Sequence, residues 1–255
     1  MRLSLARRTS QGAGLLLGLF GFTGIGMTHL LFPGLHCYAC PLAITVCPIG
    51  LVQNLVIFGT VPYFWFGAIA AYGLVAGRAF CGWFCPFGTL NDLLGFRKSR
   101  IVKSLSYAKF AALGLTILLA WLFADTLFCK VCPAASLEAS IPYLFLGVAR
   151  VNRPFLLHMG TLAGTLAGMI LVARFWCRYL CPMGAIFALF NRVSLVHLSL
   201  DKRRCTRCAE CSPACPMGLE PHADIDDHNC IKCGACTQAC SSGALSLRFS
   251  PRRTP

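Results

Sequence analysis

A long stretch without any charged residue constrains this chain more than any other feature. From Thr9 to Gly77 the sequence holds no Asp, Glu, Lys or Arg. One membrane-spanning helix needs about 20 apolar residues, so this stretch is long enough for two such helices and the turn between them. Across the whole chain, 56% of the residues are hydrophobic and only 13% are charged. These features predict an integral membrane protein.

The net charge of +14 has two readings, a nucleic-acid-binding surface or the cytoplasmic face of a membrane protein. No nucleic-acid recognition motif accompanies the basic residues, and they lie beside the apolar stretches. Cytoplasmic loops of membrane proteins carry an excess of Lys and Arg. We therefore prefer the second reading and expect no nucleic acid as a partner.

Hydropathy predicts an all-α polytopic domain over residues 1–199, with four transmembrane helices at about 12–32, 51–77, 108–128 and 154–175. Lys and Arg are frequent before the first span, after the second and after the fourth, and scarce in the other two connections. This alternation places both termini in the cytoplasm.

The two halves of this domain repeat one pattern of cysteines. In each half a span is followed by an outer C-x-x-C-P, a second span and an inner C-x-x-x-C-P. Repeats with an even number of spans are parallel and related by an axis along the membrane normal. Such an axis brings the equivalent cysteines of the two halves towards one another at each face of the membrane.

The inner cysteines are Cys81 and Cys85 in the first half and Cys177 and Cys181 in the second. On a helix this spacing would place both thiols of a pair on one face, and the proline that follows should turn the chain. Together the pairs offer four soft ligands, which suits one shared iron–sulfur or other metal site. The alternative is that they are buried structural cysteines.

The outer cysteines, Cys37/Cys40 and Cys129/Cys132, allow a further metal site, disulfides or redox-active dithiols, because they face an oxidising compartment. Cys47 has no counterpart in the second half by spacing, and the sequence does not assign it. Two histidines within or beside the spans, His29 and His158, are of a type that helps to bind quinone or ligates haem.

The remaining residues, 200–255, are polar and hold eight cysteines in two C-x2-C-x2-C-x3-C motifs. In such motifs three thiolates bind one [4Fe–4S] cluster and the fourth reaches the other cluster. We expect a small α+β, bacterial-type ferredoxin domain in the cytoplasm; zinc rarely shows this pattern twice, and disulfides do not suit the reducing cytosol. The predicted ligands are Cys205, Cys208, Cys211 and Cys240 for one cluster, and Cys215, Cys230, Cys233 and Cys236 for the other.

The order of four spans, FCGWFCPFG, FWCRYLCPMGA and two ferredoxin motifs resembles the NapH/MauN-type membrane ferredoxins, which are related to the membrane parts of NosR-like and CcoG-like proteins. The resemblance implies a multi-pass protein of the bacterial inner membrane. It also implies two [4Fe–4S] clusters and electron transfer between the quinone or quinol pool and a partner redox protein or reductase chain.

No Ser/His/Asp set, phosphate-binding loop or nucleotide fingerprint accompanies these motifs. The chain is therefore expected to be an electron carrier or a component of a quinol dehydrogenase rather than a stand-alone enzyme. The alternative is a maturation or regulatory factor, which would use its clusters and outer thiols to reduce or assemble a partner metalloenzyme.

Overall fold

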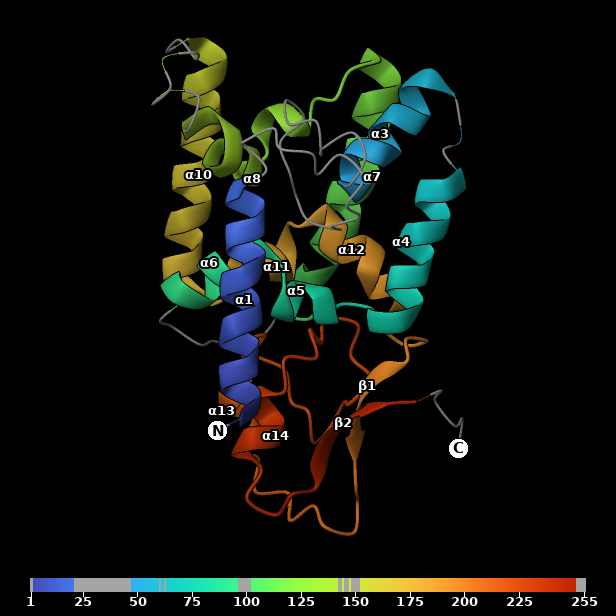
Figure 1. The fold of residues 1–255 in the computed structure, drawn as a ribbon, viewed down its shortest axis with the longest axis vertical. Helices are drawn as coiled ribbons and strands as arrows, with labels where there is room; N and C mark the ends of the chain where they lie inside the picture. The colour runs from blue at the N-terminus through green and yellow to red at the C-terminus, as the bar shows by residue number, and fades with distance from the viewer. Residues whose placement is uncertain are drawn as a thin grey trace.

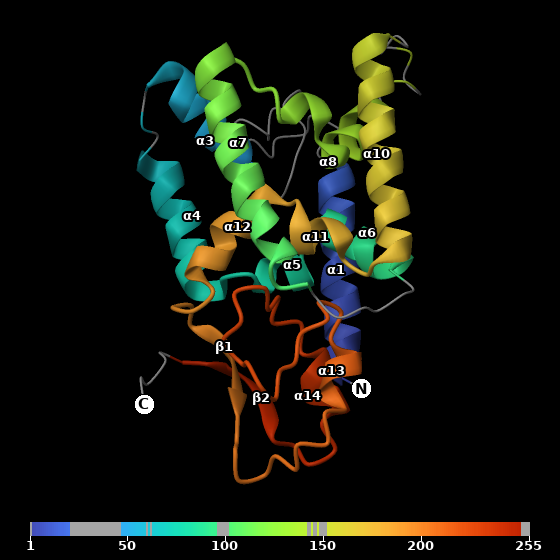
Figure 2. The same ribbon diagram turned by 180° about the vertical axis from the view of Figure 1, so that it is seen from behind.

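The structure of the chain is a computed structural model. It describes residues 2–20, 47–59, 63–95, 102–141 and 152–250, with the single residues 61, 144 and 147. Long helices form one part of the molecule and two short strands lie at the opposite end, with a layer of short helices between them (Figure 1). The view from behind shows the same three levels (Figure 2).

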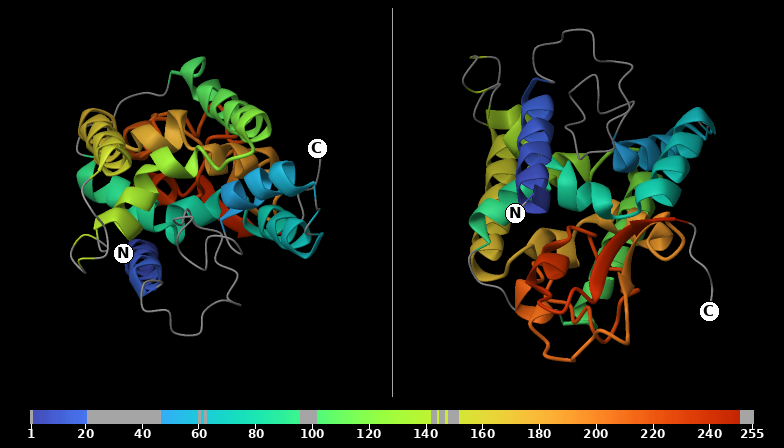
Figure 3. Two further views of the ribbon diagram at one scale, coloured as in Figure 1. Left: turned by 90° about the horizontal axis from the view of Figure 1, so that it is seen from above. Right: turned by 60° about the horizontal axis from the view of Figure 1, so that its bottom comes forward.

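The long helices stand around the short ones, as the view from above shows (Figure 3). Apolar side chains cover much of the outer surface of α4, α7 and α10, and examples are Phe64, Leu118 and Leu156, which are 75%, 48% and 59% exposed. The long helices are α1 (Arg2–Phe20), α3 (Pro48–Phe58), α4 (Tyr63–Ala76), α7 (Ala108–Phe123) and α10 (Arg153–Leu171).

One stretch in the described residues, Leu105–Phe123, is long and apolar enough to cross a membrane, and three shorter apolar helical stretches occur at 48–58, 66–76 and 155–171. The predicted span at 51–77 is not one helix. It is divided between α3 and α4, because α3 ends at Gly59, whose φ of 65° is left-handed, and Pro62 precedes α4 in the sequence. Most of the predicted span at 12–32 lies outside the described residues.

The short helices repeat in the two halves of the chain. Helix α5 (Ala79–Trp83) is followed by α6 (Pro86–Leu94), and α11 (Phe175–Tyr179) is followed by α12 (Pro182–Phe190). In each pair a cysteine in extended conformation, Cys85 or Cys181, separates the helices, and the proline after it starts the next one. Proline favours this first helical position because it has no N–H to lose there.

The spacing of the inner cysteines predicted that both thiols of a pair lie on one face of a single helix. The structure shows a different arrangement. Cys81 lies in α5 and Cys177 in α11, whereas Cys85 and Cys181 are the N-caps of the helices that follow. The proline ends one helix and starts another, so each pair of thiols spans a break between two helices.

The connection between α7 and α10 is built from short helical turns. They are η4 (Cys129–Val131), α8 (Pro133–Ala135) and η5 (Ser136–Ser140), and another turn, η3 (Leu105–Tyr107), precedes α7. Cys132 is the N-cap of α8 and again stands before a proline at the first helical position.

The C-terminal residues form the small α+β unit that the sequence predicts. Strands β1 (Val196–Leu200) and β2 (Leu245–Phe249) are antiparallel, with Leu198 opposite Leu247. The two short helices, α13 (Cys211–Ala214) and α14 (Ala235–Ala239), each carry one cysteine of a motif, Cys211 and Cys236. Leu198 and Leu245 pack with Cys211 and Cys236 in a small core of their own.

A larger core connects the helical part with this C-terminal unit. It is a continuous cluster of buried apolar residues that contact one another across the elements. Its members run from the outer turns through the short helices to the cysteine loops, and they include Cys47, Cys132, Phe87, Cys85, Met183, Cys181, Cys215, Ile231 and Cys233.

Candidate metal centres

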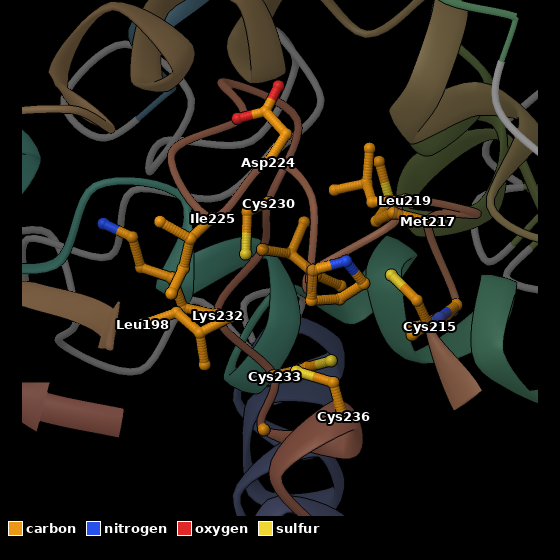
Figure 4. Close-up of a pocket in the computed structure, with 14 residues that line it drawn as sticks. Leu198, Cys215, Met217, Leu219, Asp224, Ile225, Cys230, Lys232, Cys233 and Cys236 are labelled. Carbon is orange, nitrogen blue, oxygen red and sulfur yellow. The ribbon is translucent and has the colours of Figure 1, made fainter. Parts of the chain in front are cut away.

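Four C-terminal thiols line one small pocket (Figure 4). The rest of the lining is largely apolar and includes Leu198, Met217 and Ile225. An apolar lining suits a cluster, because it excludes water from the sulfur atoms. The four thiols belong to Cys215, Cys230, Cys233 and Cys236.

A second cavity, of about 320 Å³, lies beside the end of the strands. His222 lines it as well, and its Nδ1 lies 3.7 Å from Sγ of Cys211. In both cavities three thiols come from one motif and the fourth from the other, as the ferredoxin pattern predicts. The thiols at this second cavity belong to Cys205, Cys208, Cys211 and Cys240.

The chemistry of these thiols fits a cationic metal cluster. Burial raises the pKa of Cys230 to about 12 and also raises the pKa of Cys236. A thiol in such a place stays protonated unless a cation compensates the thiolate, and binding of metal releases that proton. No group of three or more His, Cys, Asp or Glu side chains in the described part of the chain is arranged to hold one metal ion.

The four inner cysteines are brought together between the two halves. Each is at most 7% exposed. Burial raises the pKa of Cys85, and the nearby Cys81, Cys177 and Cys181 thiols raise it further. Cys81, Cys85 and Cys181 also belong to one cluster of buried core residues. A set of four buried thiols from two repeats suits a metal centre, because soft thiolate ligands bind iron–sulfur clusters.

Two buried arginines join the halves around these thiols. Arg174 donates from Nη1 to the carbonyl oxygen of Cys81 at 2.8 Å, and Arg78 donates from Nη2 to that of Cys177 at 2.9 Å. Each arginine therefore contacts the first inner cysteine of the other half. Both side chains are fully buried, and their positive charges offset the negative charge of thiolates.

The glycine of each C-P-x-G motif makes room for these arginines. A Cβ atom on Gly88 would lie 3.2 Å from Nη1 of Arg174, and one on Gly184 would lie 3.1 Å from Nη2 of Arg78. On Gly88 it would also come within 2.5 Å of the carbonyl oxygen of Cys81. The glycines are therefore explained by close packing around the thiols.

The environments of the two arginines differ. Arg174 makes a two-pronged contact with Asp92, from Nε to Oδ1 at 2.7 Å and from Nη2 to Oδ2 at 2.5 Å. Burial favours the neutral form of Asp92, but the charges and hydrogen bonds of Arg174, Arg7 and Gln11 together outweigh it and lower the pKa of the carboxyl group. Arg7 of α1 also pairs with Asp92, and Gln11 donates to it. The N-terminal helix is thereby fixed to the inner site.

Arg78 has no carboxylate directly against its guanidinium in the described part of the chain. Its Nη1 donates to the carbonyl oxygen of His228 and to Oδ1 of Asn229, both at 3.3 Å. Both partners belong to the loop that precedes Cys230. Arg78 thus connects the inner thiols to one of the C-terminal cavities.

The inner site and the first C-terminal cavity are in direct contact. A Cβ atom on Gly82 would lie 2.5 Å from the carbonyl oxygen of Ile231 and 3.4 Å from Cβ of Cys233. Nε1 of Trp83 donates to the carbonyl oxygen of Lys232 at 3.0 Å. The chain between Cys81 and Cys85 therefore packs against the chain between Cys230 and Cys233.

The second half makes matching contacts. Arg178 donates to the carbonyl oxygen of Pro216 at 2.8 Å, and Nδ2 of Asn191 donates to that of Cys230 at 2.9 Å. Sequence reasoning missed the arginines and these contacts. A readable signal existed for the arginines, because both halves carry Arg-x-x-Cys at the inner motif.

An apolar cavity of about 1250 Å³ lies between α7, η4 and α10. Leu115, Leu119 and Leu157 line it, and Trp176, beside the inner Cys177, closes one part of the wall. Nε1 of Trp176 is buried and has no hydrogen-bond partner among the described residues. The cavity thus offers an apolar volume next to the inner thiols.

The outer residues are only partly described. Cys37, Cys40 and His29 lie outside the described residues. Cys129 and Cys132 are both buried, and Cys47 is buried with them in the same part of the fold. His158 lies in α10, where Nδ1 is 2.8 Å from the hydroxyl of Ser140.

Comparison with known proteins identifies the class. A family described as "4Fe-4S binding domain" matches twice, at residues 58–104 and 156–202, and each match contains one inner cysteine pair. A second family with the same description matches residues 223–246 in the C-terminal unit. The chain therefore carries 4Fe-4S binding domains and binds [4Fe–4S] clusters.

Several relatives of the chain are named ferredoxin-type proteins. The methylamine utilization ferredoxin-type protein MauN of Methylorubrum extorquens is 30% identical over 59% of this chain and 50% of its own length. The ferredoxin-type protein NapH of Escherichia coli is 24% identical over 59% of this chain and 50% of its own. An uncharacterised protein of Methanocaldococcus jannaschii is 26% identical over 69% and 74%. The chain spans about half the length of MauN and NapH, and no solved structure matches it.

Proposed function

We propose that this chain is a membrane-anchored electron-transfer protein that passes electrons between the quinone or quinol pool and a partner redox protein or reductase chain. The contact between the inner thiols and the first C-terminal cavity carries the proposal. A redox chain needs its centres side by side, and Gly82 packs against the Ile231–Cys233 backbone at the distance of a direct contact.

Three clusters are proposed on this chain. Cys205, Cys208, Cys211 and Cys240 hold the first, and Cys215, Cys230, Cys233 and Cys236 hold the second; the two cavities lined by these sets support the assignment. Cys81, Cys85, Cys177 and Cys181 hold the third, which the two family matches around these residues support. A [4Fe–4S] cluster supplies the storage of single electrons.

The residues around the inner site favour electron transfer. Arg78 and Arg174 provide fixed positive charges beside the thiolates, so a reduced and more negative centre is stabilised there. The apolar core excludes water from the path between the inner thiols and Cys233, because Phe87, Met183 and Ile231 are at most 2% exposed.

Quinone is the proposed mobile partner on the membrane side. The apolar cavity between α7 and α10 supports this, because it borders Trp176, the residue before Cys177. The indole N–H of Trp176 is a buried donor without a partner among the described residues. A quinone carbonyl is an acceptor that such a donor suits.

We further propose that residues 1–199 cross the inner membrane of a bacterium four times, that residues 200–255 form the ferredoxin domain and that both termini lie in the cytoplasm. The exposed apolar side chains of α4, α7 and α10 support a lipid environment. Only 22% of the most apolar window of Leu105–Phe123 is buried within the protein, unlike the core helix of a soluble domain.

The proposal is tested by quinol oxidation. The full chain, purified anaerobically and placed in liposomes, is mixed with a reduced menaquinol analogue, and its clusters are followed by EPR spectroscopy. We expect the quinol to reduce the highest-potential cluster. If dithionite reduces the clusters but quinol does not, with or without a partner redox protein, the chain takes its electrons elsewhere and the maturation role gains support.

A further inference from the structure

A further group of buried thiols lies near the starts of α3 and α8. This place is on the side of the short helices opposite to the strands (Figure 1). Its members are Cys47, Cys129 and Cys132, which are 3%, 5% and 4% exposed. Three thiols buried together need an explanation, because the spacing of the sequence left Cys47 without a counterpart. The structure supplies that counterpart.

Cys47 and Cys132 occupy equivalent places in the two halves. Each is the N-cap of a helix that starts with proline, with φ and ψ of −74° and 112° at Cys47 and −70° and 122° at Cys132. The inner ligands Cys85 and Cys181 have nearly the same backbone, at −65° and 120° and at −70° and 110°. Cys47 and Cys132 thus repeat the backbone geometry of Cys85 and Cys181, the cysteines that precede proline at the inner site.

The three outer thiols are close enough to interact. Cys47 and Cys132 belong to one cluster of contacting core residues. Burial raises the pKa of Cys132, and the adjacent Cys47 and Cys129 thiols raise it further. Cys129 is connected to α3 as well, because Nε2 of Gln53 lies 3.4 Å from its Sγ.

Gln53 is a polar side chain that the local packing does not explain. It is fully buried, and its Nε2 donates to Cys129 and to the carbonyl oxygen of Ile49. Its Oε1 has no hydrogen-bond partner among the described residues. A buried amide oxygen without a partner costs about 1–3 kcal/mol, so its place beside three thiols indicates a role there.

We propose that Cys47, Cys129 and Cys132 hold a further iron–sulfur cluster, with the Gln53 amide donating to its sulfur shell. Thiolate ligands favour Cu(I), Zn²⁺ or iron–sulfur clusters. We choose an iron–sulfur cluster as the occupant because the other cysteine sets of this chain lie in matches to families described as 4Fe-4S binding domains. Three thiolates hold three irons of a cubane, and the fourth iron takes a ligand from outside this set. The inference extends the proposed electron-transfer function to the opposite side of the helical part.

The test compares the iron content of variants of the full chain, purified anaerobically. Cys47→Ala is expected to lose about four irons per chain relative to wild type, with the EPR signals of the inner and C-terminal clusters retained. Ile49→Ala is the packing control, because Ile49 is 1% exposed on the same helix and carries no thiol. It is expected to keep its iron.

A second variant distinguishes a cluster-binding site from a group of thiols with a purely structural role. Gln53→Leu keeps all three thiols, and it is expected to retain iron while changing the reduction potential of one cluster. An unchanged iron content in Cys47→Ala, an equal loss in Ile49→Ala, or a disulfide between two of the three cysteines in peptides of the native protein would each overturn the inference. Loss of the C-terminal signals in wild type would count against the proposed function instead.

Discussion

Arg174 donates a hydrogen bond to the carbonyl oxygen of Cys81, which precedes it by 93 residues. Its repeat equivalent, Arg78, makes the same contact with Cys177. The two halves of the chain are therefore locked together at the inner thiols by reciprocal contacts. A site of this kind exists only when both halves are folded against each other.

We expect the Asp92 carboxylate to be essential for the contacts that hold the two halves together at the inner thiols. Asp92→Asn leaves the fully buried Arg174 without a counter-charge, which should lower the free energy of unfolding by about 3 kcal/mol. Because the pKa of Asp92 is lowered in the folded chain, its contribution is present above its ordinary pKa of 3.8 and is lost as the pH falls through the lowered value. Chemical denaturation in detergent measures the effect.

Asp224→Asn is the matched control. Asp224 pairs with Lys103 at 3.6 Å, but both side chains are largely exposed. Its removal should change the free energy of unfolding by no more than about 0.5 kcal/mol. Equal effects of the two substitutions would contradict the role given to Asp92.

Arg78 is expected to tune the reduction potential of the inner cluster. Arg78→Gln removes a buried positive charge that stabilises the more negative, reduced state, so the potential should fall by tens of millivolts. Potentiometric titration followed by EPR spectroscopy measures it. A potential that stays constant or rises would show that the charge of Arg78 does not act on this centre.

Gly82 is expected to control the distance between the inner site and the C-terminal unit. A Cβ atom there would meet the carbonyl oxygen of Ile231 at 2.5 Å, so Gly82→Ala should push the Cys230–Cys233 loop away and slow electron transfer between the two centres. Gly114→Ala is the control, because nothing lies within 4 Å of a Cβ atom at that position. Stopped-flow reduction of the clusters compares the two variants, and equal rates would refute the contact as the route.

The apolar cavity is expected to take the quinone. Leu119 lines it, so Leu119→Trp should fill it and abolish reduction of the clusters by quinol while their iron content stays unchanged. Leu118, its neighbour on α7, is 48% exposed and does not line the cavity, which makes Leu118→Trp a close control. Reduction by quinol in the Leu119→Trp variant at the wild-type rate would place the quinone elsewhere.

Short-range patterns predicted much of this molecule. The two ferredoxin motifs identified both sets of four thiols that line the C-terminal cavities, because cluster ligation fixes their spacing along the chain. The α+β character of that unit is confirmed as well. The repeated Cys-Pro motif also predicted that the halves share a site; Arg174 and Arg78 each reach the first inner cysteine of the other half, and the shared metal site stays a prediction.

The long-range contacts could not be predicted in the same way. Helical spacing placed Cys81 and Cys85 on one helix face, but α5 ends at Trp83 between them, and the proline after Cys85 starts a new helix. The sequence left Cys47 without a counterpart, whereas its backbone geometry matches that of Cys132; Cys40, the predicted counterpart of Cys132, lies outside the described residues. Nor does sequence spacing show that Arg174 crosses to Cys81 or that Gly82 meets the Ile231 carbonyl.

The central claim is that the two halves share one cluster next to the ferredoxin unit, and iron counting with Cys85→Ala tests it most directly. Wild type and variant are purified anaerobically and compared by iron content and EPR or Mössbauer spectroscopy. We predict a loss of about four irons and of one spectroscopic centre, with both C-terminal clusters retained. If Cys85→Ala keeps the full iron content and every signal of the wild type, the inner thiols are structural and the account is wrong.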